Sequence, residues 1–291
     1  MKDIRLIFYF FIFLILAGCD RSSLFKETKI LMDTFAEISC YSSDTKEARY
    51  AIDEAFKEIE RIEKVFSKFD EESEVSKVNT LAGERNIVIS PEMFKLLEHS
   101  IYYSKLSKGC FDITVEPFKK GRYEKIILDR DNLSVHFLDK DMKIDFGGIA
   151  KGYAVDRAKE ILVSHGIKSA LINIGGNIFA LGNPHSRKAW QIGIRDPREK
   201  SKIIYKVNLK DRAVSTSGSY ERPFHIIDPS TGEPSDEMFS VTIVAGSAEE
   251  ADALSTAVFV MGLQKGLELV NSLEGIEIYT IDKTGNITTY P

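Results

Sequence analysis

The stretch IDFGGIAKGYAVD, Ile144–Asp156, decides the predicted fold, because it joins an apolar run to a helical pattern through two adjacent glycines. We expect a strand that ends at these glycines and a helix from Ile149 to about residue 165. Gly147 and Gly148 carry no Cβ, so the backbone can approach a ligand, and the first helical amides would face an anion such as a pyrophosphate. By itself the pattern is more often a tight turn, with Lys151 an ordinary solvated residue.

Segments on both sides of this stretch predict alternating strands and helices. Upstream we expect a strand over 29–42, a helix from about residue 46 with apolar residues at three-to-four spacing, and a helix from Ser90-Pro91 to 109. Downstream, Ser247 and Glu250 have the spacing of a capping box. The pattern is that of mixed α/β organisation in one large domain or two close lobes. The other expected elements are strands near 171, 192, 205 and 241, helices reaching about 260 and 273, and two terminal strands.

The N-terminus has the features of a bacterial lipoprotein signal. Lys2 and Arg5 precede an uncharged run over 6–16, which is too short to span a bilayer comfortably. The run ends in Leu-Ala-Gly-Cys, which resembles a lipobox and predicts lipidation of Cys19; the alternative is an ordinary cleaved signal with an incidental cysteine. We expect anchoring to the inner (cytoplasmic) membrane, facing the periplasm or the cell exterior. The expected divisions are a signal peptide over 1–18, a lipidated tether over 19–28 and a folded domain over 29–291.

Charge and cysteine content limit the classes of partner. Removal of residues 1–18 takes away two basic residues and one acidic residue, which leaves 37 basic and 43 acidic residues and a net charge of −6. Nucleic-acid binding needs a basic surface, so we expect no nucleic-acid partner. Cys40 and Cys110 would lie in a compartment where disulfides can persist, as a bridge or as two free thiols. Neither has the spacing of a metal ligand.

Three further polar segments follow apolar runs. Asn173–Asn177 carries a second glycine pair, Ser215–Tyr220 clusters hydroxyl groups around a glycine, and His225–Gly232 joins a strand to a tight turn. Each has an ordinary interpretation as a turn. A lone histidine on an apolar strand, such as His225, is usually a satisfied core residue, and acid–base work would need a partner.

Asp252 and Thr256 lie four residues apart in the predicted helix after Ser247, so their side chains share one helix face. A carboxylate and a hydroxyl there can share a hard cation, because Mg²⁺ prefers oxygen ligands and keeps few protein contacts. A backbone carbonyl and substrate phosphate oxygens could complete such a site. The alternative is a solvated pair of polar residues.

Taken together, these segments resemble the ApbE family of FAD:protein FMN transferases, in order along nearly the whole mature chain. The resemblance implies an α+β fold, with mixed sheets and packed helices in a two-lobed, T-fold-like architecture, over the domain 29–291. It also implies an enzyme with FAD as substrate and Mg²⁺ as cofactor. The other stretches that carry it are Met32-Asp33-Thr34, Phe66–Asn79 (FSKFDEESEVSKVN) and Gly109–Pro117 (GCFDITVEP).

Matched position by position, the resemblance implies the residues of an FAD site and of a metal site. Asp112 would be the partner of the adenine or the ribose. Mg²⁺ would be held by the backbone carbonyl of Ala150 and by the side chains of Asp252 and Thr256. The FAD contacts would come from Met32, Phe69, Cys110, Phe111, Asp112, Gly147, Lys151, His225 and Ile226.

Two positions depart from the family pattern. Phe69 stands where the family often has tyrosine or tryptophan, so the ring is kept and its polar tip is lost. Ser219 stands where many members have aspartate, in an S-G-D-Y pattern, and this change can alter a metal or substrate contact. The role of the hydroxyl cluster is therefore less defined than that of the other segments.

The expected reaction moves FMN from FAD to a threonine or serine hydroxyl of a client flavoprotein and releases AMP. Catalysis would rest on Asp252 as metal ligand, on Lys151 with the helix amides, and on His225 or a nearby carboxylate as base. The alternatives are an FAD pyrophosphatase that gives FMN and AMP, a non-catalytic FAD-binding lipoprotein and, more weakly, a structural lipoprotein. The resemblance implies clients in membrane electron-transport complexes, such as sodium-pumping quinone reductases and Rnf-type complexes.

Overall fold

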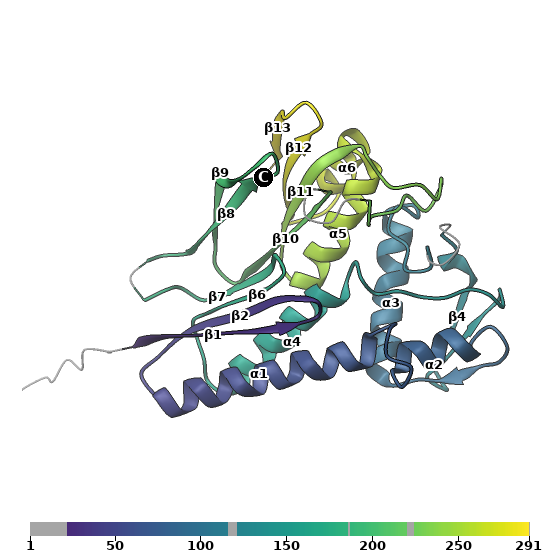
Figure 1. The fold of residues 1–291 in the computed structure, drawn as a ribbon, viewed down its shortest axis with the longest axis horizontal. Coiled ribbons are helices and arrows are strands. Elements are labelled where there is room, and N and C mark those ends of the chain that lie inside the picture. The colour runs from purple at the N-terminus through teal and green to yellow at the C-terminus, as the bar shows by residue number, and fades with distance from the viewer. Residues whose placement is uncertain (1–21, 116–120, 186, 220–223, 291) are drawn as a thin grey trace, which may run out of the picture.

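The computed structural model describes residues 22–115, 121–185, 187–219 and 224–290. Its largest sheet is built from β1 (Ser23–Leu31), β2 (Thr34–Ser42), β6 (Ala170–Ile174), β7 (Asn177–Leu181), β10 (Arg212–Gly218), β11 (Met238–Ala245), β12 (Glu277–Asp282) and β13 (Ile287–Tyr290). These strands pair in the order β1-β2-β6-β7-β10-β11-β12-β13, with antiparallel neighbours (Figure 1). The sequence prediction of an α+β fold is confirmed.

Helices cover one face of this sheet. Ala213 and Ile243 point into the core beneath the helices, whereas their chain neighbours Val214 and Val244 belong to a second core on the other side. This alternation is the period-two pattern of strands buried on both faces. The covering helices are α1 (Thr45–Phe66), α4 (Ala150–Ser164) and α5 (Ala248–Met261), with α6 (Leu263–Asn271) packed on α5 and β12. Because α4 packs between α1 and α5, its first turn is held against both neighbours.

A two-stranded ribbon covers part of the opposite face. It consists of β8 (Trp190–Asp196) and β9 (Glu199–Leu209), which form a sheet of their own. Ile194, Val207 and Leu209 of the ribbon pack with Val214 and Val244 of the main sheet in the second core. The ribbon therefore shields apolar side chains that the helices cannot reach.

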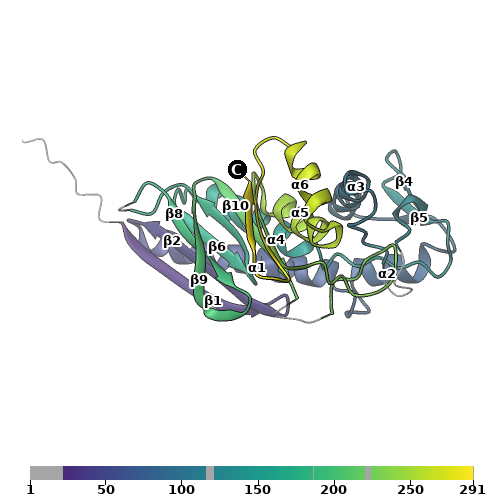
Figure 2. The same cartoon turned by 90° about the horizontal axis from the view of Figure 1, so that it is seen from above.

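A second lobe lies at one end of the molecule, where the C-terminal part of α1 projects beyond the main sheet (Figures 1 and 2). It contains α2 (Glu74–Leu81), α3 (Pro91–Leu106), the 3₁₀ turn η1 (Tyr123–Lys125) and a three-stranded sheet of β3 (Ile87–Val88), β5 (Ser134–Phe137) and β4 (Ile126–Asp129). The apolar residues of both lobes form one continuous core. The lobes therefore present a fixed junction in which a site can be built.

Two helix starts occur where the sequence predicts them. The Ser90 hydroxyl accepts a hydrogen bond from the Met93 amide at the start of α3, and Ser247 accepts one from the Glu250 amide at the start of α5. Each satisfies an amide that the first helical turn leaves without a backbone partner.

Two strand predictions are wrong. The strand predicted over 29–42 is a hairpin, because the backbone of Met32 and Asp33 turns with positive φ between β1 and β2. Since β1 begins at Ser23, most of the predicted tether over 19–28 is strand. The segment that leads into the paired glycines is irregular rather than a strand: the Asn79 side chain bonds both the amide and the carbonyl of Ile144, in place of a neighbouring strand.

The predicted signal peptide, residues 1–18, and Cys19 lie outside the described residues. Among the residues that the structure does describe, no helix is long and apolar enough to cross a membrane. Cys40 and Cys110 are both free thiols, which settles the alternative that the sequence leaves open.

Candidate active site

A cavity of about 680 Å³ lies at the junction of the two lobes. Its walls come from the β1–β2 turn, the chain after α1, the loop after α3, the start of α4, the β6–β7 turn, the end of β10, the segment 225–229 and the middle of α5. All twelve positions predicted for FAD and metal line this single cavity: Met32, Phe69, Cys110, Phe111, Asp112, Gly147, Ala150, Lys151, His225, Ile226, Asp252 and Thr256. Residues from six distant segments thus meet at one place.

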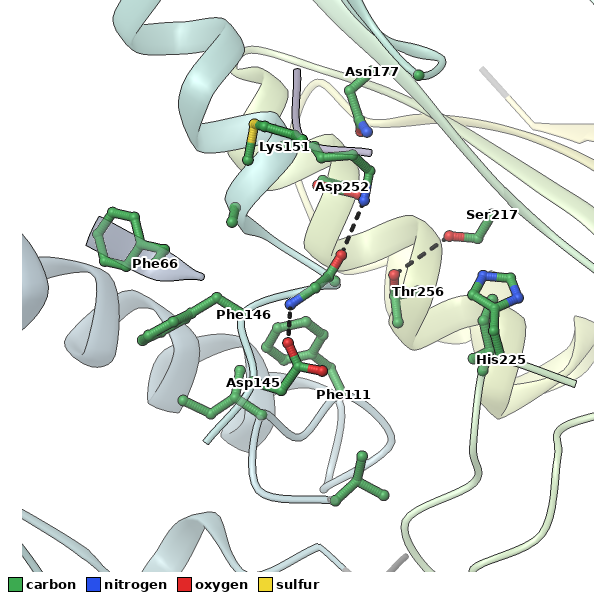
Figure 3. Close-up of a pocket in the computed structure, with 18 of the residues that line it drawn as sticks. Phe66, Phe111, Asp145, Phe146, Lys151, Asn177, Ser217, His225, Asp252 and Thr256 are labelled. Atoms are coloured by element: carbon green, nitrogen blue, oxygen red, sulfur yellow. Dashed lines mark hydrogen bonds between the residues drawn. The ribbon is translucent and has the colours of Figure 1, made fainter. Parts of the chain in front are cut away.

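The start of α4 lies at the cavity, and the Gly152 amide of its first turn is bound by the Asp252 carboxylate of α5. The N-cap residue Ile149 offers no side-chain hydrogen bond to the helix. The Asp145 amide donates to the Ile113 carbonyl at 2.7 Å. The Gly147 amide donates to Asp145 Oδ1 at 2.9 Å, and Lys151 Nζ donates to the Gly147 carbonyl at 3.0 Å (Figure 3). The ammonium group and the positive end of the helix dipole therefore lie together, which is an arrangement that favours a phosphate group.

The backbone at Gly148 passes close to two other parts of the cavity wall. A Cβ at this position would lie 3.2 Å from the Phe111 ring and 3.4 Å from Thr256 Oγ1. The backbone therefore approaches α5 and the loop after α3 as closely as atoms allow. This contact brings the glycine turn and the Thr256 hydroxyl to the same side of the cavity.

Asp252 is a buried carboxylate at the bottom of the cavity. Its side chain comes from α5 and accepts a hydrogen bond of 2.9 Å from the Gly152 amide of α4. Burial raises the pKa of Asp252, and the nearby Lys151 ammonium opposes this rise. Lys151 offsets only part of the cost of removing this carboxylate from water, so a bound cation would stabilise the ionised form further.

A chain of hydroxyl groups leads from α5 to the cavity wall at β10. The Ser255 hydroxyl donates to the Asp252 carbonyl at 3.0 Å and lies 2.9 Å from the Ser217 hydroxyl. The Ser217 hydroxyl in turn lies 3.3 Å from Thr256 Oγ1. If each hydroxyl donates toward Ser255, Ser217 accepts from Thr256, and the lone pairs of Thr256 stay available on the cavity side. Ser217 belongs to the hydroxyl cluster predicted over Ser215–Tyr220, and it is the member that bonds to Ser255 and Thr256.

These features fit the predicted metal site. Asp252 supplies a desolvated carboxylate, Thr256 supplies a hydroxyl, and Ala150 lines the same cavity. Oxygen donors of this kind suit Mg²⁺, which completes its shell with water and phosphate oxygens. In the described part of the chain no three histidine, cysteine or acidic side chains form a cluster that could hold a metal. The predicted ligands contain only one such side chain.

Asp112 and Cys110 are less available than the resemblance implies. Asp112 Oδ1 accepts from the amide and the hydroxyl of Thr114, and Oδ2 accepts from the Tyr123 amide. Its carboxylate therefore organises the loop after α3, and burial raises its pKa. Burial also raises the pKa of the Cys110 thiol, so this side chain stays protonated and acts as a small apolar contact.

Two lining residues escape sequence reasoning. Glu63 Oε1 accepts a hydrogen bond of 2.9 Å from the Met32 amide and so holds the β1–β2 turn at the cavity. Lys68 forms an ion pair of 2.7 Å with Asp145 beside the glycine turn. Glu63 occupies a polar position of a long amphipathic helix and Lys68 an exposed loop, so neither differs in sequence from a solvated residue.

Phe69, which the resemblance predicts as an FAD contact, lies in the wall of this cavity. The residue leaves 80% of its surface exposed, which is unusual for a phenylalanine. Ser219 lies just beyond the end of β10 and is not among the lining residues, whereas Thr216, Ser217 and Gly218 are.

Comparisons with known proteins give a matching family and a named relative. The family model described as the ApbE family matches residues 32–280. A protein of Treponema pallidum (strain Nichols), named FAD:protein FMN transferase, is 30% identical over 302 residues, covering 87% of this chain and 83% of that protein.

Solved structures share the whole fold. The crystal structure of the ApbE protein from Thermotoga maritima MSB8 superposes with a TM-score of 0.84 at 31% identity, over 91% of this chain and 96% of that one. The apo form of the flavinyl transferase ApbE of Pseudomonas stutzeri gives a TM-score of 0.82 at 26% identity, over 92% of this chain and 94% of that one.

Proposed function

The chain belongs to the ApbE family, and from this premise we propose that it transfers FMN from FAD to a threonine or serine hydroxyl of client flavoproteins, with Mg²⁺, and releases AMP. One observation carries the proposal: the start of α4 with Lys151, where the N-cap residue makes no side-chain hydrogen bond, and a buried carboxylate–hydroxyl pair face the same cavity. A helix start of this kind binds phosphate, and such an oxygen pair binds the cation that accompanies it.

The cavity has the size and lining that a dinucleotide needs. About 680 Å³ lies within the range of small-molecule sites, and apolar side chains such as Phe69 and Phe111 alternate with a few polar groups. We propose that the flavin ring stacks on Phe69 and that the pyrophosphate lies at Gly147–Lys151. The Lys151 ammonium would then exchange its bond to the Gly147 carbonyl for one to a phosphate oxygen.

Asp252, Thr256 and the Ala150 carbonyl would hold Mg²⁺. When bound, the ion polarises the phosphoanhydride and neutralises the charge that develops as that bond breaks. The chain's own contribution is orientation: Gly152 holds the Asp252 carboxylate, and Ser217 holds the Thr256 hydroxyl. Side chains fixed in this way act without reorganising during the reaction.

In the transfer step the acceptor hydroxyl oxygen attacks the phosphorus of the FMN half. A phosphoester bond forms, the bond from that phosphorus to the bridging oxygen breaks, and AMP leaves with that oxygen. The hydroxyl proton passes to a base, and we propose His225 Nδ1 or Nε2 for this role, because His225 lines the cavity. Water in place of the acceptor would give FMN and AMP, which is the pyrophosphatase alternative.

We also propose that the lipid on Cys19 tethers the protein to the inner membrane, facing the periplasm or the cell exterior. The lipobox-like Leu-Ala-Gly-Cys run supports this proposal. A tethered transferase would meet clients that belong to membrane electron-transport complexes.

The test is incubation of the full chain, purified in detergent, with FAD, Mg²⁺ and a peptide that carries a client's acceptor threonine. Mass spectrometry would show an FMN adduct on the threonine if the proposal is right. AMP and free FMN without an adduct would identify a pyrophosphatase. FAD that remains intact would identify a binding protein.

A further inference from the structure

Asp156 makes a contact that the proposed mechanism does not use. It lies on α4, one helical turn after Gly152, and its side chain is only 13% exposed. Its Oδ1 accepts from the Ala248 amide at 3.1 Å, and its Oδ2 accepts from the Glu249 amide at 2.9 Å. One carboxylate thus satisfies two of the first amides of α5, a role that a residue of the same helix usually has.

This contact is matched by another in the opposite direction. The α5 carboxylate Asp252 accepts from the α4 amide of Gly152 at 2.9 Å. Gly152 and Asp156 are four apart on α4, and Ala248 and Asp252 are four apart on α5, so the two contacts lie one turn apart along the same interface. Each helix therefore donates amides to a carboxylate of the other.

The interface leaves no room for a different register. A Cβ at Gly152 would lie 2.2 Å from the Ala248 carbonyl oxygen and 2.8 Å from Asp252 Cβ. Hydrogen bonds to an ionised carboxylate are about twice as strong as neutral ones and have narrower geometry. A slide or rotation of α5 would break the contacts at both turns together.

We propose that Asp156 is a positioning residue that sets the register of α5 against α4 and thereby places Asp252 and Thr256 opposite Ala150 and Lys151. Asp156 touches neither the substrate nor the cation; it acts through the α5 backbone. The inference rests on the proposed function, since it concerns the proposed Mg²⁺ site. Outer residues that orient metal ligands typically change metal affinity by about 10- to 100-fold when they are replaced.

The chain offers a matched control. Asp44 caps α1 by accepting from the amides of Lys46 and Glu47 at 2.8 and 3.1 Å, which is the same chemistry at an exposed site away from the cavity. Asp44→Ala therefore removes two similar hydrogen bonds without touching the α4–α5 interface.

The experiment compares Asp156→Ala, Asp156→Asn and Asp44→Ala with the wild type, as full chains in detergent. The first readout is hydrogen exchange in EDTA, which needs no activity. Exchange at Gly152 and in the first two turns of α5 should speed up in both Asp156 variants, more in the alanine variant. In Asp44→Ala only the start of α1 should exchange faster.

The second readout is the Mg²⁺ concentration for half-maximal AMP release from FAD. It should rise about tenfold or more in the Asp156 variants, while saturating Mg²⁺ restores kcat and the KM for FAD stays unchanged. Asp44→Ala should leave the midpoint at the wild-type value.

Unchanged exchange at Gly152, or a midpoint no higher than in Asp44→Ala, would overturn the inference. If wild type releases no AMP, the proposed function fails, and the exchange data alone decide whether Asp156 sets the register.

Discussion

The Gly152 amide of α4 donates a hydrogen bond of 2.9 Å to the Asp252 carboxylate of α5, across 100 residues of sequence. This bond joins the anion-binding turn to the metal-binding face of the proposed site. It holds the buried carboxylate against the residue that follows Lys151, and both Lys151 and Asp252 line the cavity. The arrangement of the site therefore depends on how α4 and α5 pack.

Gly152→Ala should destabilise the protein. The added Cβ would lie 2.2 Å from the Ala248 carbonyl oxygen, a backbone atom that cannot move cheaply. Overpacking of this kind costs about 1–3 kcal/mol, against a gain of about 1 kcal/mol from the helix propensity of alanine. Urea unfolding should show a net loss. Gly246→Ala is the control, because its Cβ would meet nothing within 4 Å; equal stability of the two variants would contradict the prediction.

Asp252→Asn should raise the stability of the metal-free protein at neutral pH. Burial raises the pKa of Asp252 above its ordinary value of 3.8, so the folded state binds the proton more tightly than the unfolded state. The stability of the wild type therefore falls as the pH rises from that value through the raised pKa. Asparagine has no such cost. Thermal unfolding in EDTA should give a higher Tm for the variant than for the wild type at pH 7, and a smaller difference between the two in acid. A lower Tm for the variant at pH 7 would show that neighbouring groups offset the cost of burying the ionised carboxylate.

Phe69→Ala should weaken FAD binding. Loss of a stacked ring costs about 1 kcal/mol, which corresponds to about a fivefold higher Kd. Phe69→Trp should retain the wild-type affinity or improve it. Flavin fluorescence titration checks both variants. The matched control is Leu138→Ala, since Leu138 is also exposed, at 62%, and does not line the cavity. Equal affinities of the Phe69→Ala and Leu138→Ala variants would remove Phe69 from the site.

The pairing of His99 on α3 with Glu249 on α5 should make stability depend on pH. Glu249 Oε1 accepts a hydrogen bond from His99 Nδ1 at 2.7 Å, which raises the pKa of His99 above its ordinary value of 6.5, and partial burial opposes the rise. This contribution is complete below the ordinary pKa and is lost as the pH rises through the folded value. Urea midpoints of the wild type should fall relative to those of His99→Gln between about pH 6 and pH 9. Parallel curves for the two proteins would refute the link.

The sequence predicts the chemistry of the site better than it predicts the backbone around it. Four-residue spacing places Asp252 and Thr256 on one helix face, and the paired glycines mark the start of α4; both hold because they depend on local geometry. The sequence does not predict the hairpin at Met32, because the two residues that adopt positive φ in its turn are neither glycine nor asparagine. The extended segment at Ile144 looks like a strand, but its partner is the side chain of Asn79.

Long-range partners have no local sequence signal. Nothing near Asp156 indicates that its carboxylate caps a helix that begins 92 residues later. Glu63 looks like any solvated position of α1 until the fold brings it to the Met32 amide. Position-by-position resemblance to the family supplied the lining residues from separate segments, and the structure supplied the contacts that orient them.

The most direct test of the account compares the yield of FMN–threonine adduct from wild type and Asp252→Asn, at saturating FAD and with Mg²⁺ present or replaced by EDTA. Intact mass spectrometry of the acceptor peptide measures the adduct, and chromatography measures the AMP released with it. We predict one AMP per adduct for the wild type with Mg²⁺, and a rate lower by about 100-fold or more for Asp252→Asn or in EDTA. An adduct formed equally fast by Asp252→Asn, or without Mg²⁺, would contradict the claim that this cavity is a metal-dependent FMN transferase site.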